Sequence, residues 1–151
     1  MMKNILLTFA ILFSAFVSAQ ANEVDVKNTI NLFFDAFHKQ DSVQLKAVAT
    51  NTVILQTIGA DKDGNTVVKT ESYSDFIKNI VSIPEEVNFK EKLTSYTIKI
   101  DGDMANAWTE YEFWLNGKFS HCGVNSFQLF KDNGEWKIIY LIDTRRKKGC
   151  N

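Results

Sequence analysis

Two Asn-Gly dipeptides, Asn116-Gly117 and Asn133-Gly134, constrain the fold of this chain more than any other feature of its sequence. Each lies between runs in which apolar and polar residues alternate, and Asn-Gly in that setting is a strong signal for a two-residue β-hairpin turn. The alternating runs cover residues 87–100, 104–115, 118–130 and 135–144. The C-terminal half is therefore predicted to be a set of long antiparallel strands.

The N-terminal half has the period of helices instead. Apolar residues at spacings of three and four predict a helix over residues 24–39. Asp41 can cap a second helix, and Ser72 with Asp75 forms a capping box for a third. The predicted buried stripe of the first helix is Val26, Ile30, Phe33, Phe34 and Phe37. Helices followed by antiparallel strands predict an α+β fold, with the helices packed on one face of the sheet.

The first 21 residues have the pattern of a signal peptide. Lys3 precedes a largely apolar run over residues 5–17, and small residues then permit cleavage after Ala19 or Ala21. The run is shorter than the ~20 residues that a transmembrane helix needs. We expect an exported protein, periplasmic or secreted, with one mature domain over residues 22–151 and no membrane anchor after cleavage.

The charge balance argues against a nucleic-acid partner. Without the leader the chain has 16 basic and 18 acidic residues, whereas nucleic-acid-binding domains carry a clear excess of positive charge. The basic run at 145–148 is therefore interpreted as a solvated tail. A chain of this length can bury a sufficient core without metal or disulfide staples.

The two turns also predict a register, and with it the residues on each face of the sheet. Two-residue loops place Glu112 opposite His121, Tyr111 opposite Cys122, and Cys122 opposite Arg145. The predicted inner face is Trp108, Glu110, Glu112, Trp114, His121, Asn125, Phe127, Leu129, Trp136, Ile138, Tyr140 and Ile142. A single bulge would exchange the two faces of a strand beyond it.

His121 and Cys122 are neighbours on one strand, so their side chains point to opposite faces and cannot form a Cys–His pair. The chain has one other histidine, His38, and lacks zinc- and nucleotide-binding motifs. We expect no metal and no cofactor. Cys122 is expected to bond to Cys150, because exported chains oxidise their cysteines and the tail beyond Arg145 can fold back over the sheet edge. Two free thiols or a link between chains are the alternatives.

The predicted inner face supplies the candidate functional residues. His121 with Glu112 or Glu110 could form a general base with its orienting partner, although a purely structural cross-strand pair has the same sequence pattern. The candidate ligand contacts are Trp108, Asn125, Tyr140 and Arg146. Aromatic side chains often line ligand pockets, but the same rings could be ordinary core.

The helical half with "FFDAFHKQD" and the stretch "GKFSHCGVNSFQLFKDNGEWKIIYLIDTRRKKGC" resemble the nuclear transport factor 2-like superfamily. This superfamily includes ketosteroid isomerases, polyketide cyclases and scytalone dehydratase. The resemblance implies a cystatin-like cone of helices on a strongly curved sheet, with a deep pocket between them and homodimerisation through the sheet. Within the superfamily, the chain is most similar to the exported bacterial proteins of the lumazine-binding group.

The isomerase residues do not carry over. The resemblance places a carboxylate base where residues 53–57 contain no ionisable group, and a tyrosine where residues 22–40 contain none. Three functions stay open. The chain could bind a small apolar or aromatic molecule, act as a dehydratase, cyclase or isomerase through His121, or be a dimeric interaction module without a ligand.

Overall fold

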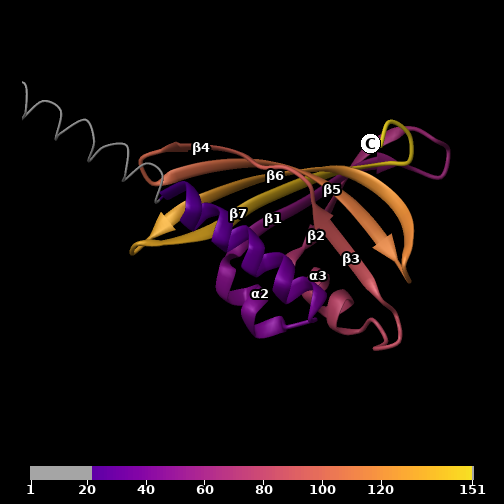
Figure 1. Ribbon diagram of the computed structural model, residues 1–151, viewed down its shortest axis with the longest axis horizontal. Helices are drawn as coiled ribbons and strands as arrows, with labels where there is room; N and C mark the ends of the chain where they lie inside the picture. The colour runs from indigo at the N-terminus through magenta and orange to yellow at the C-terminus, as the bar shows by residue number, and fades with distance from the viewer. Residues whose placement is uncertain (1–21, 151) are drawn as a thin grey trace, which may run out of the picture.

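The computed structural model describes residues 22–150, and the predicted signal peptide lies outside them. Residues 22–38 form the first helix, followed by α2 (Ser42–Val48) and α3 (Tyr73–Val81). The strands are β1 (Ala49–Ala60), β2 (Thr66–Ser72), β3 (Phe89–Leu93), β4 (Thr97–Asp101), β5 (Met104–Leu115), β6 (Lys118–Asp132) and β7 (Glu135–Arg146). Figure 1 shows the helices on one side of a strongly curved sheet. None of the helices between residues 22 and 150 is long and apolar enough to cross a membrane.

The helices begin where the capping residues predict. Asp41 Oδ1 accepts hydrogen bonds from the backbone N–H groups of Val43 and Gln44 at 3.0 and 2.9 Å, which caps α2. Ser72 Oγ accepts from the Asp75 N–H at 3.1 Å and caps α3. The predicted stripe of the first helix is also confirmed, because all five of its residues are buried.

The strands form one mixed sheet in the order β2-β1-β7-β6-β5-β3, with β4 paired to β5 beside β3. The pair β1–β7 is parallel and the other pairs are antiparallel. The α+β fold class is therefore confirmed, although the sheet is not purely antiparallel. The run at 87–100 is two short strands rather than one long strand, because β3 and β4 pair with opposite ends of β5.

The hairpin β5–β6 has the predicted turn and then a bulge. Leu115 pairs with Lys118, as a two-residue loop requires, but Phe113 pairs with His121. The extra residue on β6 is Ser120. Beyond it every partner moves by one position, so the predicted pair of Glu112 with His121 is wrong.

The hairpin β6–β7 has the same construction. Leu129 pairs with Ile138 as predicted, whereas Gln128 pairs with Tyr140, so Ile139 is the extra residue on β7. Cys122 consequently faces Arg146 instead of Arg145. The two bulges exchange the faces of β5 and of the second half of β7 relative to the prediction.

The inner face therefore differs from the predicted one on two of its three long strands. The residues that face the helices are Ala105, Ala107, Thr109, Tyr111, Phe113, His121, Asn125, Phe127, Leu129, Trp136, Ile138, Leu141, Asp143 and Arg145. Phe127 is the centre of the core: it is fully buried and lies edge-on to Phe33 and Phe34 of the first helix.

The predicted disulfide is confirmed. Cys122 on β6 bonds to Cys150, with their α-carbons 5.8 Å apart. The bond returns the C-terminal tail to the outer face of the sheet, beside the strand that also carries His121 on its inner face.

Candidate functional site

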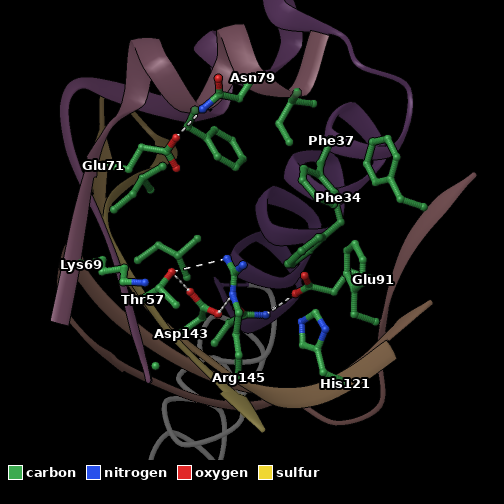
Figure 2. A pocket seen from close by; sticks show the side chains of 18 of the residues that line it. Phe34, Phe37, Thr57, Lys69, Glu71, Asn79, Glu91, His121, Asp143 and Arg145 are labelled. Carbon is green, nitrogen blue, oxygen red and sulfur yellow. Dashed lines mark hydrogen bonds and ion pairs between the residues drawn. The ribbon is translucent and has the colours of Figure 1, made fainter. Parts of the chain in front are cut away.

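A cavity of about 1090 Å³ lies between the helices and the concave face of the sheet (Figure 2). This volume is slightly above the ~300–1,000 Å³ typical of small-molecule sites. The apolar wall is made by Phe33, Phe34, Phe37, Leu55, Phe76, Ile80, Phe113, Leu115 and Leu141. The resemblance implied a pocket in this place, and the fold provides it.

The floor of the cavity carries a polar row across neighbouring strands. Asn125 of β6 pairs with Thr109 of β5 on one side and with Asp143 of β7 on the other. Asp143 in turn pairs with Thr57 of β1. Paired residues share a face, so the register places Asn125, Asp143 and Thr57 together on the cavity floor.

Arg145 is held on this floor by two neighbours. Its Nε donates to Asp143 Oδ2 at 3.0 Å, and its Nη2 lies 3.4 Å from Thr57 Oγ1. The Thr57 hydroxyl donates to the other oxygen of Asp143. Burial works to lower the pKa of Arg145, but the adjacent Asp143 carboxylate outweighs it and raises the pKa. The guanidinium therefore stays charged, and 58% of the side chain remains exposed.

The side chain of Tyr111 on β5 reaches Asp143 on β7. Its hydroxyl donates to the Thr144 carbonyl oxygen at 2.9 Å and lies 3.3 Å from Asp143 Oδ2. The tyrosine ring lies over Gly123, where a Cβ atom would come within 2.7 Å of the ring and 1.8 Å of the Thr144 carbonyl oxygen. Only glycine leaves room for this contact. Burial, followed by the charge of Asp143, raises the pKa of Tyr111, which stays neutral.

Glu91 of β3 is the second acid on the inner face. Its Oε1 accepts a hydrogen bond from Asn125 Nδ2 at 2.7 Å, and its backbone N–H donates to His38 Nε2 at 2.9 Å. Burial raises the pKa of Glu91 to about 7, and the charge of Asp143 adds to this effect. The hydrogen bond from Asn125 and the charge of Arg145 act to lower the pKa, but they offset only part of this rise.

His121 completes the polar part of the cavity. It stacks on Phe113, with ring centroids 4.9 Å apart, and its Nδ1 lies 3.1 Å from Ser120 Oγ. Burial, followed by the charge of Arg145, lowers the pKa of His121. The imidazole is therefore mainly neutral at pH 7.

The rim joins α3 to the β1–β2 hairpin. Asn79 Nδ2 of α3 donates to Glu71 Oε1 of β2 at 2.8 Å, and Lys69 lies beside them on the same strand (Figure 2). Within residues 22–150, no group of three or more His, Cys, Asp or Glu side chains is placed to hold a metal ion.

The structure brings only part of the predicted site together. His121 and Asn125 line the cavity. The residues on the opposite face or at its edge are Trp108, Glu110, Glu112, Tyr140 and Arg146. The cause is the pair of bulges: they turn the alternate residues of β5, and of β7 beyond Ile139, toward the helices. The predicted combination of His121 with Glu112 or Glu110 is therefore wrong.

The displaced residues have other partners. Glu112 accepts a hydrogen bond from Trp114 Nε1 at 3.1 Å, and the Tyr140 hydroxyl donates to Gln56. Arg146 Nη1 donates to carbonyl oxygens of the C-terminal tail. Half of the Trp108 surface is exposed.

Sequence reasoning missed Glu91, Asp143, Arg145 and Tyr111. For Glu91 a signal exists: it lies two residues after Phe89 in an alternating run, so the two side chains share a face, and Phe89 is an obvious core residue. For Asp143 and Arg145 the sequence carries no such signal, because the bulge at Ile139 reverses the face of every residue that follows it on β7.

Comparison with known proteins identifies the fold. No family model and no curated protein matches the sequence. Solved structures do match. A nuclear transport factor 2-like protein with a cystatin-like fold from Novosphingobium aromaticivorans is 11% identical, with a TM-score of 0.70 over 91% of this chain and 90% of that one. A nuclear transport factor 2-like protein of unknown function from Pseudomonas putida is 12% identical, with a TM-score of 0.69 over 86% and 90%.

A third structure, a protein of unknown function with a cystatin-like fold from Nostoc punctiforme, is 12% identical, with a TM-score of 0.65 over 83% of this chain and 92% of that one. The predicted nuclear transport factor 2-like fold is thus confirmed. At such low identities the likeness shows the fold alone, and the lumazine-binding assignment stays a prediction.

Proposed function

We propose that this protein binds a small ring-bearing molecule in the cavity, with an anionic or carbonyl oxygen at Arg145 and an apolar body against the phenylalanine wall. The observation that carries the proposal is the guanidinium of Arg145, fixed by Asp143 and Thr57 yet still largely exposed on the floor of an aromatic cavity. A charged donor held in place loses little entropy when it binds an oxygen.

The apolar wall sets the other half of the specificity. Burial of ligand rings against phenylalanine side chains contributes about 25 cal/mol per Å² of apolar surface. One charged contact orients the ligand, and the wall supplies most of the affinity. A flat aromatic acid or a ring-bearing ketone matches both parts.

The test is a fluorescence titration with 8-anilino-1-naphthalenesulfonate, which has fused rings and one anionic group. Wild-type protein should bind it with a blue-shifted emission, and 2-naphthoate should displace it better than 2-naphthamide does. Arg145→Gln should weaken binding by about tenfold or more, since hydrogen bonds to charged groups contribute ~1.5–3 kcal/mol. The matched control is Arg146→Gln, which removes the same charge one residue along, on the opposite face. Equal losses in both variants would contradict the proposal.

We also propose that the protein is exported, with cleavage after Ala19 or Ala21. The leader pattern and the Cys122–Cys150 disulfide support this, because such bonds persist in oxidising compartments. The intact mass and N-terminal sequence of protein from the periplasm or medium of its host should begin at Gln20 or Asn22. A full-length chain retained in the cytoplasm would contradict the proposal.

The outer face of the sheet is the place where we propose that a second copy of the chain packs. Trp108, Ile54 and Val68 are large apolar side chains exposed on this face, and such patches mark interaction surfaces. Light scattering coupled to size exclusion should show a dimer, and Trp108→Glu should convert it to a monomer. Val43→Glu, at an exposed valine on α2, is the control. A wild-type monomer would contradict this proposal and would exclude the interaction-module function.

A further inference from the structure

We propose that the contact between the His38 imidazole and the outer edge of β3 is a pH-sensitive switch, which opens the ligand cavity in acid. With a neutral His38, the first helix and β3 close one side of the cavity, and protonation of His38 separates them. The inference rests on the proposed function, because it describes how the ligand of that same cavity is released. It adds a regulation to a site otherwise described only as a binding site.

The first observation is the hydrogen bond that joins the first helix to β3. Among residues 22–150, β3 pairs only with β5 and is therefore an edge strand. The backbone N–H of Glu91 points away from β5 and donates to His38 Nε2 at 2.9 Å. In the part of the chain that the structure describes, this is the one hydrogen bond between residues 22–38 and β3.

The second observation is that this hydrogen bond requires a neutral imidazole. Because Nε2 of His38 accepts the Glu91 N–H, it carries no proton, and the proton of the neutral ring is on Nδ1. An imidazolium has a proton on both nitrogens and cannot accept a hydrogen bond. A buried N–H without an acceptor is costly. Protonation therefore favours a state in which the first helix and β3 separate and water reaches both groups.

The charges around His38 keep the ring neutral while the contact is closed. Burial is the largest effect and lowers the pKa of His38 from its usual 6.5, and the charge of Lys90 on β3 lowers it further. Asp35, one turn earlier on the first helix, acts to raise the pKa but does not offset these two effects. The other charged groups close to His38 are Lys39 on the chain, Glu85 before β3 and Glu91 on β3.

Glu91 does not hold a protonated His38 in place. Burial raises the pKa of Glu91 to about 7, so its carboxyl is mostly neutral at the pH at which His38 takes up a proton. An acid that stayed ionised there would attract the imidazolium and keep the two elements together. Both groups therefore change in the direction that weakens the contact as the pH falls.

The third observation is that β3 forms part of the cavity wall. Phe89 lies edge-on to Phe37 of the first helix, with ring centroids 5.1 Å apart, and both rings line the ligand cavity. Figure 2 shows Glu91 on the same side of the cavity as Phe34 and Phe37. Separation of β3 from the first helix therefore opens this side of the cavity.

A second cavity of about 280 Å³ gives solvent access to His38. It lies between His38 and Gln40 on one side and residues of the segment 84–89 on the other. Pro84, Val87 and Phe89 line both cavities, so they form the wall between them. An imidazolium that has lost the Glu91 N–H can turn into this smaller cavity.

Gln40 limits how far the opening extends. Its Nε2 donates to the carbonyl oxygen of Ile83 at 2.8 Å, and an amide does not titrate in this pH range. The chain before β3 thus stays attached to the end of the first helix when the His38 contact opens. The switch consequently moves β3 and leaves the rest of the fold in place.

The direct test is NMR spectroscopy of the ¹⁵N-labelled wild-type protein. At pH 8, Nε2 of His38 should have the chemical shift of an unprotonated ring nitrogen and Nδ1 that of a protonated one. The protection factor of the Glu91 amide hydrogen should fall several-fold between pH 8 and pH 5.5. About tenfold is the upper limit, because pH 5.5 lies one unit below the usual pKa of His38. The control is the Thr94 amide, which donates to the Glu110 carbonyl oxygen of β5 at 2.8 Å and should stay protected.

The substitution His38→Gln separates the switch from other effects of pH. Its amide oxygen can accept the Glu91 N–H in place of Nε2 and takes up no proton. After rapid dilution, 8-anilino-1-naphthalenesulfonate should dissociate at the same rate from both proteins at pH 8. At pH 5.5 it should leave the wild type several-fold faster than His38→Gln. The titrations of His121 and Glu91 cancel in this comparison, because both proteins contain these residues.

A second variant tests the open state without acid. His38→Leu has no acceptor for the Glu91 N–H, so the Glu91 amide should exchange quickly and the dye should dissociate quickly even at pH 8. The Thr94 amide reports in the same experiment whether the pairing of the sheet is intact. A Glu91 amide that stays protected in His38→Leu would contradict the role of the imidazole.

The outcomes separate this inference from the binding proposal. A protein that binds no dye at any pH contradicts the proposed function, while the NMR measurements still test the His38 contact in the free protein. A proton on Nε2 at pH 8, or a Glu91 protection factor that stays constant as His38 titrates, overturns the switch and leaves the binding proposal intact. Equal dissociation rates from the wild type and His38→Gln at pH 5.5 overturn it as well.

Discussion

The buried carboxyl of Glu91 should make the free energy of unfolding depend on pH, and the substitution Glu91→Gln tests this dependence. The pKa of its carboxyl is about 7 in the folded protein, against a usual value of 4.5. One pKa unit corresponds to about 1.4 kcal/mol, so keeping the ionised carboxylate buried costs about 3 kcal/mol. An acid with a raised folded pKa binds more protons in the folded than in the unfolded state between pH 4.5 and 7. Its stabilising contribution is complete below pH 4.5 and is lost as the pH rises through 7.

Glu91→Gln removes this dependence and keeps the shape of the side chain and its ability to accept from Asn125. The free energy of unfolding of wild type and variant is measured with urea at several pH values between about 4.5 and 8.5. As the pH rises across this range, the difference between the two should grow by about 3 kcal/mol in favour of the variant. The contributions of His38 and His121 cancel, because both proteins contain them. Glu110→Gln should show no such growth. If the free energies of unfolding of the wild type and of Glu91→Gln differ by the same amount at every pH in this range, the account of the buried carboxylate is refuted.

Three further predictions follow from the packing around the site. Gly123→Ala should cost about 1–3 kcal/mol in chemical unfolding, because the new methyl group overlaps the ring of Tyr111, and it should also weaken binding of anionic dyes. Replacing both Cys122 and Cys150 with serine should lower the free energy of unfolding by about 3 kcal/mol, since the bond closes a 28-residue loop; an unchanged value would contradict this. His38 has a pKa lowered by burial and then by Lys90, so its contribution to stability is lost as the pH falls below about 6.5, and His38→Gln should make acid unfolding less steep.

The helices were predictable because their signals are local. A cap such as Asp41 or Ser72 and an apolar period of 3.6 act within a few residues, so they appear in the sequence in the form the structure uses. The Asn-Gly turns are local in the same way, and they set the first pairs of each hairpin correctly.

The bulges at Ser120 and Ile139 depend on the packing of both sheet faces, which no local signal contains. On β5 the large rings of Trp108 and Trp114 suggest the wrong inner face. The small side chains Ala105 and Ala107 face the helices, and Ala107 pairs with the large ring of Phe127. The size of a side chain therefore does not predict which face it occupies where a small residue pairs with a large one on the neighbouring strand.

On β7 the apolar residues 138–142 occupy both alternating positions, so their pattern cannot tell which side faces inward. The acidic and basic groups that follow were consequently assigned to the wrong face. The cavity could be predicted from the resemblance to the superfamily. The residues on its floor could not, because the register of the sheet beyond the bulges decides which residues face inward.

A crystal structure of the protein with 2-naphthoate bound tests the central claim most directly. The account predicts the carboxylate within hydrogen-bond distance of the Arg145 guanidinium and the rings against Phe34 and Phe37, with Glu91 facing the same space. A ligand bound elsewhere, or an Arg145 side chain turned to the outer face of the sheet, would contradict it.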